Sequence, residues 1–180
     1  AKQNEIKFIE GWTFAQIRKV LNEHPAIEYK SAGLSDQQIL QHIGASETAV
    51  EGIFFPDTYY FIKGSSDLDI LQRAYKTMQN HLQNYWSERV ESLPLNTPYE
   101  ALILASIIEK ETGAESDRAE IAGVFINRLR KGMKLQTDPT VIYGLGEQFD
   151  GNLRKKDLLA DQEYNTYTRA GLPPTPISLP

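Results

Sequence analysis

Two glutamates at the end of an aliphatic run are the residues of this sequence best suited to proton-transfer chemistry. The stretch "IIEKETG", residues 107–113, contains Glu109 and Glu111, separated by a single lysine. A carboxyl group held against apolar walls has its charged form disfavoured, so it can both give and take a proton near neutral pH. Which glutamate meets that condition depends on the helix that carries both.

The ends of that helix are well marked in the sequence. Thr97 and Glu100 form a capping box, and Pro98 suits the first helical position. Gly113 suits a left-handed stop at the C-terminal end. We therefore expect a helix over residues 98–112.

The phase of this helix separates the two glutamates. At about 100° per residue, Glu111 lies on the side of Ile107, at the centre of the apolar face. Glu109 points about 160° away, towards a polar side with Leu102 and Ser106. We predict that Glu111 is the inward, working acid and that Glu109 is a solvated or ion-paired surface residue.

A structural role is the alternative for Glu111, since a carboxylate in the last turn can reach past the helix end to a buried arginine or a backbone donor. Arg128 is available, because Ser116 can cap a following helix whose apolar stripe includes this arginine. The other members of that stripe are Ile121, Val124, Phe125 and Leu129. Arg128 could orient a catalytic Glu111 or merely pair with it.

Neutral polar side chains follow in "KLQTDPTVIYGLG", residues 134–146. Asp138 fits the N-cap of a short helix that begins with Pro139 and ends at Gly144, and capping alone accounts for this aspartate. Amide and hydroxyl groups that could hydrogen-bond sugar hydroxyls or N-acetyl groups are supplied by Gln136, Thr137 and Tyr143.

The C-terminal stretch "EYNTYTRAGLPPTPISLP" has neither a helical nor a strand period. Such a segment is costly to order unless it packs on something, so we interpret it as a loop that lines a cleft. Its polar and aromatic side chains include Tyr164, Asn165, Thr166 and Tyr167.

Composition excludes several classes of function. The net charge of −5 over 180 residues argues against a nucleic-acid partner, which normally meets a basic surface. The absence of cysteine excludes disulfides and thiol nucleophiles, and the three histidines lack the spacing of metal ligands. Motifs of serine hydrolases, zinc proteases and nucleotide-binding enzymes are absent, so we expect carboxylate chemistry without a metal or cofactor.

The first half of the chain reads as a mixture of strands and helices. A strand in "IKFIEGW" precedes a helix capped by Thr13 and Gln16, and Ser35 with Gln38 opens a second helix that Gly44 can end. The segment "EGIFFPDTYYFIKGSS" predicts a hairpin or an aromatic-lined loop, although its aromatic residues could simply be core. Helical spacing over residues 67–90 predicts the longest helix.

We therefore predict an α+β fold, mainly helical, in which a small mixed α/β lobe at residues 1–95 precedes a catalytic lobe at residues 96–180. The two prolines of "SLPLNTP" mark the boundary. Because the chain starts without methionine and stops on a Pro-rich segment, we expect it to be a piece of a longer protein, truncated at the C-terminus.

Three long motifs, in this order, resemble the YceG/MltG family of endolytic murein transglycosylases: "ASIIEKETG", "VFINRLRKGMKLQTDPTVIYGLGE" and "YNTYTRAGLPPTPIS". The stretches "FIEGWTF" and "EGIFFPDTYYF" resemble the earlier part of the same catalytic domain. The resemblance spans nearly the whole chain and implies that the catalytic lobe is lysozyme-like.

The resemblance also implies an activity and a set of site residues. The second glutamate of the E-K-E-T motif would be catalytic, and it falls on Glu111, the residue that helix phase selects independently. The activity would be endolytic cleavage of the MurNAc-β-1,4-GlcNAc bond in nascent peptidoglycan strands, with formation of 1,6-anhydro-MurNAc. Asn165 would hold the substrate or the glutamate by analogy with the "AYN" motif of lysozyme-like relatives. Further candidates for substrate binding are Gln136, Thr137, Tyr143, Thr166 and Tyr167.

Two other functions remain open at this point. A hydrolysing muramidase would need a second carboxylate, for which Asp138 or Asp157 could serve. A non-catalytic glycan-binding scaffold of the cell-wall machinery would use the same motifs to hold shape. The resemblance further implies the bacterial inner membrane, with the catalytic domain facing the periplasm, a single-pass anchor outside this stretch, and peptidoglycan synthases as partners.

Overall fold

A computed structural model describes residues 3–180, apart from the side chain of Glu115. The chain forms two compact units, Ala1–Ser87 with Ser178–Pro180, and Glu88–Ile177. Helices dominate and strands are short, so the predicted α+β, mainly helical class is confirmed. The lobe boundary predicted at residues 95/96 concerns functional parts of the chain and stays a prediction.

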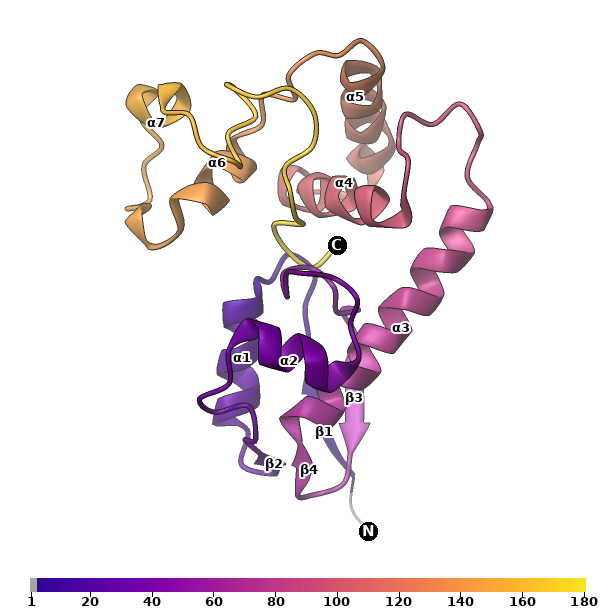
Figure 1. The fold of residues 1–180 in the computed structure, drawn as a ribbon, viewed down its shortest axis with the longest axis vertical. Coiled ribbons are helices and arrows are strands. Elements are labelled where there is room, and N and C mark those ends of the chain that lie inside the picture. Colours follow the sequence, from indigo (N-terminus) through magenta and orange to yellow (C-terminus); the bar gives the residue numbers. More distant parts are fainter. Residues whose placement is uncertain (1–2) are drawn as a thin grey trace. The chain divides into compact units, whose positions relative to one another are not determined.

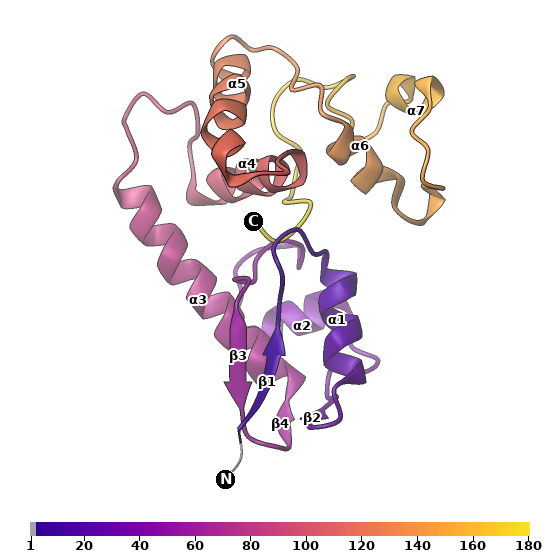
Figure 2. The same ribbon diagram turned by 180° about the vertical axis from the view of Figure 1, so that it is seen from behind.

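The first unit contains two pairs of short strands (Figures 1 and 2). Strand β1 (Asn4–Lys7) pairs antiparallel with β3 (Thr58–Phe61), and β2 (Ile27–Glu28) pairs parallel with β4 (Ser65–Ser66). The hairpin expected within residues 51–66 is therefore wrong. The apolar run before the Pro56 turn enters the core as irregular chain, with Phe54 fully buried, so β3 finds its partner at the start of the chain.

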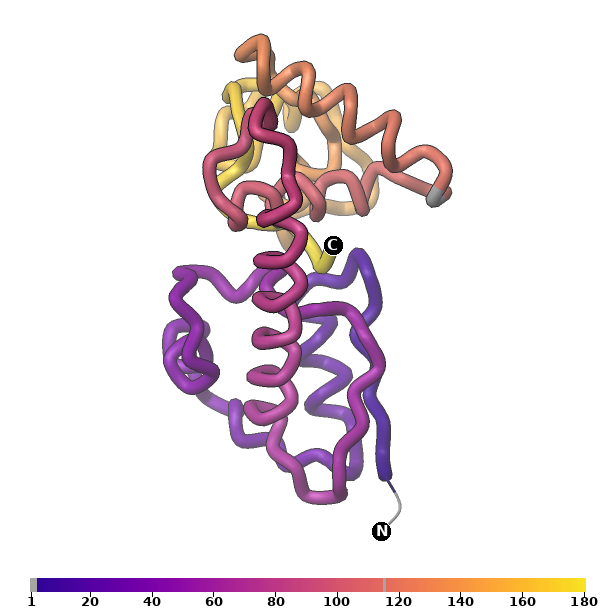
Figure 3. Tube along the Cα trace, turned by 90° about the vertical axis from the view of Figure 1, so that its right-hand side faces the viewer, coloured from indigo at the N-terminus to yellow at the C-terminus, as the bar shows by residue number. Residues whose placement is uncertain are grey.

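Three helices complete this unit, α1 (Phe14–Glu23), α2 (Asp36–Ile43) and the long α3 (Asp67–Ser87), which Figure 3 shows along its length. The capping boxes predicted for α1 and α2 are both present, and Gly44 ends α2 in the left-handed conformation at φ 73°. The core side chains with almost no exposure include Ile17, Leu21, Ile39, Ile43, Phe54, Ile70 and Leu71.

The second unit carries four helices and two short 3-10 segments. The helices are α4 (Pro98–Glu111), α5 (Arg118–Arg130), α6 (Asp138–Leu145) and α7 (Lys155–Leu159). The 3-10 segments are η1 (Glu115–Asp117), which leads into α5, and η2 (Gly146–Gln148), which follows α6. Both α5 and α6 pack against α4.

The roles predicted for Gly113, Ser116, Asp138 and Gly144 at helix ends are all wrong. Helix α4 ends at Glu111, and the next residue, Thr112, has extended backbone, φ −90° and ψ 128°; its hydroxyl and N–H both bond to the carbonyl of Ile108. Gly113 is therefore not needed as a left-handed stop. Ser116 lies within η1, and Asp117 rather than Ser116 immediately precedes α5.

Gly144 does not end α6, which continues to Leu145 and stops at Gly146, whose φ is 57°. A Cβ atom on Gly144 would overlap the side-chain amide of Gln162. The end of a distant side chain therefore lies against this glycine, a contact that local sequence cannot reveal.

None of the helices in the described part of the chain is long and apolar enough to cross a membrane.

Candidate active site

Glu111 is the last residue of α4, and this helix is buried on nearly every side. Leu102 and Ser106, expected on a polar side, are 2% and 0% exposed. Ser106 tolerates burial because its hydroxyl accepts the N–H of Ile177 at 3.0 Å and donates to the carbonyl of Ile103. The polar side predicted for this helix is wrong, since α4 is a central helix of its unit.

The two glutamates nevertheless have different environments. Glu109 pairs with Arg118 at 2.6 Å, and its side chain is only 13% exposed. Glu111 is exposed at the end of the helix, so it is not enclosed by apolar walls as predicted. The ion pair predicted as one option for Glu109 is confirmed, although Glu109 is the more buried residue of the two.

A pocket of about 210 Å³ opens beside Glu111. Its walls come from the end of α4, one face of α5 and the chain that enters α6. The lining residues are Glu111, Ile121, Val124, Phe125, Arg128, Gln136 and Thr137. Arg128 reaches the same pocket but donates to the carbonyl of Leu135 at 2.5 Å. No ion pair joins it to Glu111 in the described structure, so the pairing alternative is not observed.

Thr137 is the residue that contacts Glu111 directly. Its hydroxyl donates to Glu111 Oε1 at 2.5 Å, and Thr137 itself is only 3% exposed. Thr166 holds the segment in place, because its carbonyl accepts the N–H of Gln136 at 3.1 Å and its hydroxyl accepts the N–H of Thr137 at 3.0 Å. Two stretches that are far apart in sequence thus position one hydroxyl against the carboxylate.

Gln136 has backbone φ of 52°, the only positive φ of a non-glycine residue among those the structure describes. Side chains other than glycine, asparagine and aspartate seldom adopt this conformation, and its cost is of order 1–3 kcal/mol. The neighbouring bonds to Thr166 hold the strained residue in place, with its exposed side chain at the pocket. Strain at a pocket next to a carboxylate is typical of a functional site.

Asp138 is the first residue of α6, and Thr137 is its N-cap, so the predicted capping role of Asp138 is wrong. Its carboxylate instead accepts the hydroxyl of Tyr167 at 2.5 Å. Burial raises the pKa of Tyr167 to about 12, with further contributions from the hydrogen bond to Asp138 and from the charges of Asp138 and Glu111, against the opposing charge of Arg128. The negative charges of Asp138 and Glu111 therefore both act on the pKa of Tyr167.

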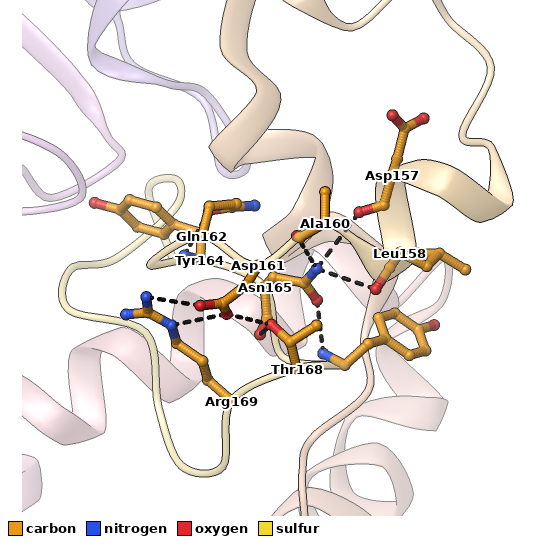
Figure 4. A network of polar contacts seen from close by, with 10 residues as sticks. Asp157, Leu158, Ala160, Asp161, Gln162, Tyr164, Asn165, Thr168 and Arg169 are labelled. Carbon is orange, nitrogen blue, oxygen red and sulfur yellow. Dashed lines mark hydrogen bonds and ion pairs between the residues drawn. The ribbon is translucent and has the colours of Figure 1, made fainter.

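Asn165 is fully buried and bonds only to backbone groups in the contacts observed here (Figure 4). Its Nδ2 lies 2.7 Å from the carbonyl of Ala160, 3.1 Å from that of Leu158 and 3.4 Å from that of Asp157. Its Oδ1 accepts the N–H of Tyr167 at 2.9 Å. These bonds fix the loop that carries Tyr167, and the structure does not bring Asn165 into contact with Glu111.

The other predicted substrate-binding residues divide into two groups. Gln136 and Thr137 line the pocket, and Thr166 and Tyr167 support it from the loop behind. Tyr143 lies apart, with its ring against Tyr164 at 4.9 Å between centroids and 60° between planes.

Sequence reasoning missed Thr140. This residue is fully buried. Its hydroxyl lies 2.9 Å from the carbonyl oxygen of Thr137 and 2.9 Å from the hydroxyl of Thr166. The spacing of the two threonines in "TDPT" is the signal that could have found it, because residues three apart meet in the first turn of a helix.

A larger pocket of about 420 Å³ lies elsewhere in the same unit. Its lining residues are Leu145, Gln148, Phe149, Asp150, Asn152, Arg154, Lys156 and Asp157. Arg154 binds Asp150 with both terminal nitrogens and lowers its pKa to about 2. Asp157, considered as a second carboxylate, lines this pocket and not the one beside Glu111.

Comparison with known proteins gives consistent matches. The model of the YceG-like family matches residues 1–180. The endolytic murein transglycosylase of Bacillus subtilis (strain 168) is 42% identical over 130 residues, which cover 72% of this chain and 35% of that protein. The protein of the same name from Streptococcus pneumoniae serotype 2 (strain D39 / NCTC 7466) is 32% identical over 136 residues, 73% of this chain and 24% of that protein.

A crystal structure of a YceG-like protein from Listeria monocytogenes matches with a TM-score of 0.78 and 32% identity, covering 99% of this chain and 64% of that one. The alignments with the two curated relatives span 35% and 24% of their lengths.

Proposed function

This chain belongs to the YceG-like family, and on that premise we propose that it is the catalytic part of an endolytic lytic transglycosylase of peptidoglycan. It would cleave the MurNAc-β-1,4-GlcNAc bond of nascent glycan strands and leave 1,6-anhydro-MurNAc ends. The names of the curated relatives support the reaction class. The observation that carries the proposal is an exposed carboxylate, Glu111, oriented by the Thr137 hydroxyl at the mouth of a pocket.

A single carboxyl group can perform both halves of this reaction. Protonated Glu111 transfers its proton to the glycosidic oxygen, the C1–O bond of MurNAc breaks, and the GlcNAc end leaves as an alcohol. The C6 hydroxyl oxygen of MurNAc then bonds to C1, and the Glu111 carboxylate takes the hydroxyl proton. No water is consumed, and Glu111 ends in the protonation state in which it began.

The lining of the pocket suits a neutral sugar. Gln136 contributes an amide, and the aliphatic and aromatic side chains Ile121, Val124 and Phe125 offer an apolar wall. Arg128 supplies the positive charge near Glu111.

Hydrolysis is the second candidate, and Asp138 is the observation that favours it. Asp138 is the residue after Thr137, and the charge of its carboxylate, like that of Glu111, raises the pKa of Tyr167. A second carboxylate near the acid could activate water, as in hydrolysing glycosidases. The products distinguish the two reactions, because hydrolysis leaves hydrated reducing ends and intramolecular attack leaves anhydro ends.

Product analysis of purified sacculi by mass spectrometry tests the proposal. The full-length protein should release anhydro-MurNAc ends, Glu111→Gln should release none, and the matched control Glu109→Gln should retain activity because Glu109 is committed to Arg118. Hydrated ends that disappear in Asp138→Asn would establish the hydrolase instead. Glycan binding without any product, unchanged in Glu111→Gln, would establish a non-catalytic scaffold.

The proposal includes a location and partners. A protein acting on nascent strands works where they emerge, so we place it at the bacterial inner membrane with its catalytic domain facing the periplasm, beside peptidoglycan synthases. Protease accessibility of the full-length protein in intact spheroplasts tests this location, and a catalytic domain protected from external protease would contradict it.

A further inference from the structure

Three buried threonines form a closed hydrogen-bond cluster directly behind Glu111. The hydroxyl of Thr140 lies 2.9 Å from the carbonyl oxygen of Thr137 and 2.9 Å from the hydroxyl of Thr166. The hydroxyl of Thr166 accepts the N–H of Thr137 at 3.0 Å and lies 3.3 Å from the carbonyl oxygen of Thr137. Thr137, Thr140 and Thr166 are 3%, 0% and 2% exposed, so the cluster is sealed inside the unit.

Counting hydrogens shows what the cluster does to Thr137. Thr140 and Thr166 have one hydroxyl hydrogen each, and their close acceptors are the Thr137 carbonyl and each other. Either Thr166 donates its hydrogen to Thr140 and Thr140 donates to the carbonyl, or Thr140 donates to Thr166 and Thr166 donates to the carbonyl. Either way, the N–H and the carbonyl of Thr137 are both bonded, and in the part of the chain that the structure describes no hydrogen bond joins the Thr137 side chain to either hydroxyl.

The hydroxyl hydrogen of Thr137 is therefore directed outward, to Glu111 Oε1 at 2.5 Å. Thr137 is β-branched and its backbone is fixed on both sides, so its χ1 rotamer has little freedom. This hydroxyl could accept a proton from Glu111 only if its own hydrogen found another acceptor. Among the described residues, Glu111 Oε1 is the acceptor that the Thr137 hydroxyl contacts.

We propose that this cluster assigns different roles to the two oxygens of Glu111. Oε1 is the permanent acceptor of the Thr137 hydroxyl, and Oε2 is the oxygen that carries the catalytic proton. Thr137 is a positioning residue, not a substrate ligand, and Thr140 and Thr166 act through it. This inference rests on the proposed function for its kinetic readout, but the orientation of the carboxylate can be observed without turnover.

The proton inventory of the reaction is simple in this scheme. The Oε2–H bond breaks as the proton moves to the glycosidic oxygen, while Oε1 keeps its bond from Thr137. The C1–O bond to GlcNAc breaks and the C1–O6 bond forms. The C6 hydroxyl proton then returns to Oε2, so no proton passes through the threonine cluster.

The matched pair Thr137→Val and Thr137→Ser tests the positioning role. Valine keeps the shape and removes the hydroxyl, whereas serine keeps the hydroxyl. The Thr137 side chain makes no capping bond to α6, so the valine variant should not lose the helix start. We expect kcat on glycan strands to fall about 10- to 100-fold in Thr137→Val, KM to stay within about twofold, and serine to restore most of the rate.

Thr140 gives a second and cleaner pair, because this residue is fully buried and cannot touch a glycan. Thr140→Val should lower kcat about 3- to 10-fold without raising KM, and Thr140→Ser should restore it. A rise in KM with unchanged kcat in the Thr137 variants would show that these hydroxyls bind substrate and would overturn the inference.

Two activity-independent measurements complete the test. Crystal structures should show the Glu111 carboxylate turned away from its present position in Thr137→Val and retained in Thr137→Ser; an unmoved carboxylate in the valine variant would overturn the inference. In a Glu111→Gln background, adding Thr137→Val should leave glycan affinity unchanged, and weaker binding would overturn it.

If the wild-type protein yields no anhydro ends, the proposed function is wrong. The crystal structures of Thr137→Val and Thr137→Ser would still test whether the cluster orients the Glu111 carboxylate. If the wild type yields anhydro ends and Thr137→Val has the same kcat as the wild type, the inference about the cluster is wrong while the proposed function stands.

Discussion

Asn165 offers a stringent test of how the loop behind the pocket is held, because its buried side chain is bonded at both polar atoms. Asn165→Asp keeps the size of the side chain but replaces the N–H donors with a carboxylate oxygen. That oxygen would face the carbonyl oxygens of Ala160 and Leu158, which now lie 2.7 Å and 3.1 Å from Nδ2. The bond from the Tyr167 N–H to Oδ1 would survive.

The cost follows from the bonds lost and the charge gained. Two buried hydrogen bonds contribute about 1 kcal/mol each, and a buried charge without a partner costs about 3–5 kcal/mol when it is created by removing its counterpart. Relaxation of the loop recovers part of this sum. We expect the free energy of unfolding of the second unit to fall by about 3–5 kcal/mol.

Urea denaturation followed by far-UV circular dichroism measures this change, with Asn152→Asp as the control because Asn152 is exposed in the same unit. The control should stay within about 0.5 kcal/mol of wild type. An Asn165→Asp protein as stable as the control would refute the view that these carbonyl contacts hold the loop.

Three further predictions concern residues around the pocket. Tyr167, whose pKa is about 12, stays protonated in the folded state above the unfolded value of 10, so this tyrosine stabilises the fold below pH 10 and that contribution is lost as pH rises from 10 to 12. Burial also raises the pKa of Tyr59 and Tyr75, so pH-dependent unfolding should show a smaller loss of stability over this range in Tyr167→Phe than in wild type, and equal slopes would contradict the prediction. Gly144→Ala should displace the Gln162 amide and break its bond from the Tyr164 N–H, which offsets the gain in helix propensity of about 1 kcal/mol; in a Gln162→Ala background the same substitution should stabilise by about 1 kcal/mol in a double-mutant cycle measured by denaturation, and no gain there would contradict the prediction. Gln136→Gly should raise the free energy of unfolding by about 1 kcal/mol by releasing the φ of 52°, and an unchanged or lower value by denaturation would show that the backbone there is unstrained.

Local signals predicted local structure well in this chain. The capping boxes of α1 and α2 and the start of α4 at Thr97 depend on residues within four positions of each other, and all three are present. Gly44 ends α2 as predicted, whereas the stop signals at Gly113 and Gly144 failed. Gly144 resembles a helix stop in sequence, but the helix continues through it, and the Gln162 side chain, eighteen positions away, lies against it.

The candidate site was harder to predict because its parts meet through tertiary contacts. Thr137 and Thr166 could be named from sequence as polar residues, yet only the fold shows that one orients Glu111 and the other supports it. The only sequence signal for Thr140 was its spacing from Thr137, since a threonine in the first turn of a helix is otherwise common. Asn165 was selected by resemblance as a ligand of substrate or glutamate, and the contacts observed here are those of a loop support.

The identification of Glu111 by helix phase therefore needs a different physical basis. Helix α4 has no polar side on which Glu109 could be set apart, because Leu102 and Ser106 are as deeply buried as Ile107. The distinction arises from position along the helix and from partners. Glu109 lies about half a turn earlier in the packed region and pairs with Arg118, whereas Glu111 is the residue at which the helix leaves the core. An acid at that point is open to a ligand on one side and can accept a hydrogen bond on the other, and the Thr137 hydroxyl donates that bond.

If proximity to apolar residues were the decisive property, Glu109 would be the better acid. Comparing the products of Glu109→Gln and Glu111→Gln therefore separates the two physical explanations as well as the two residues.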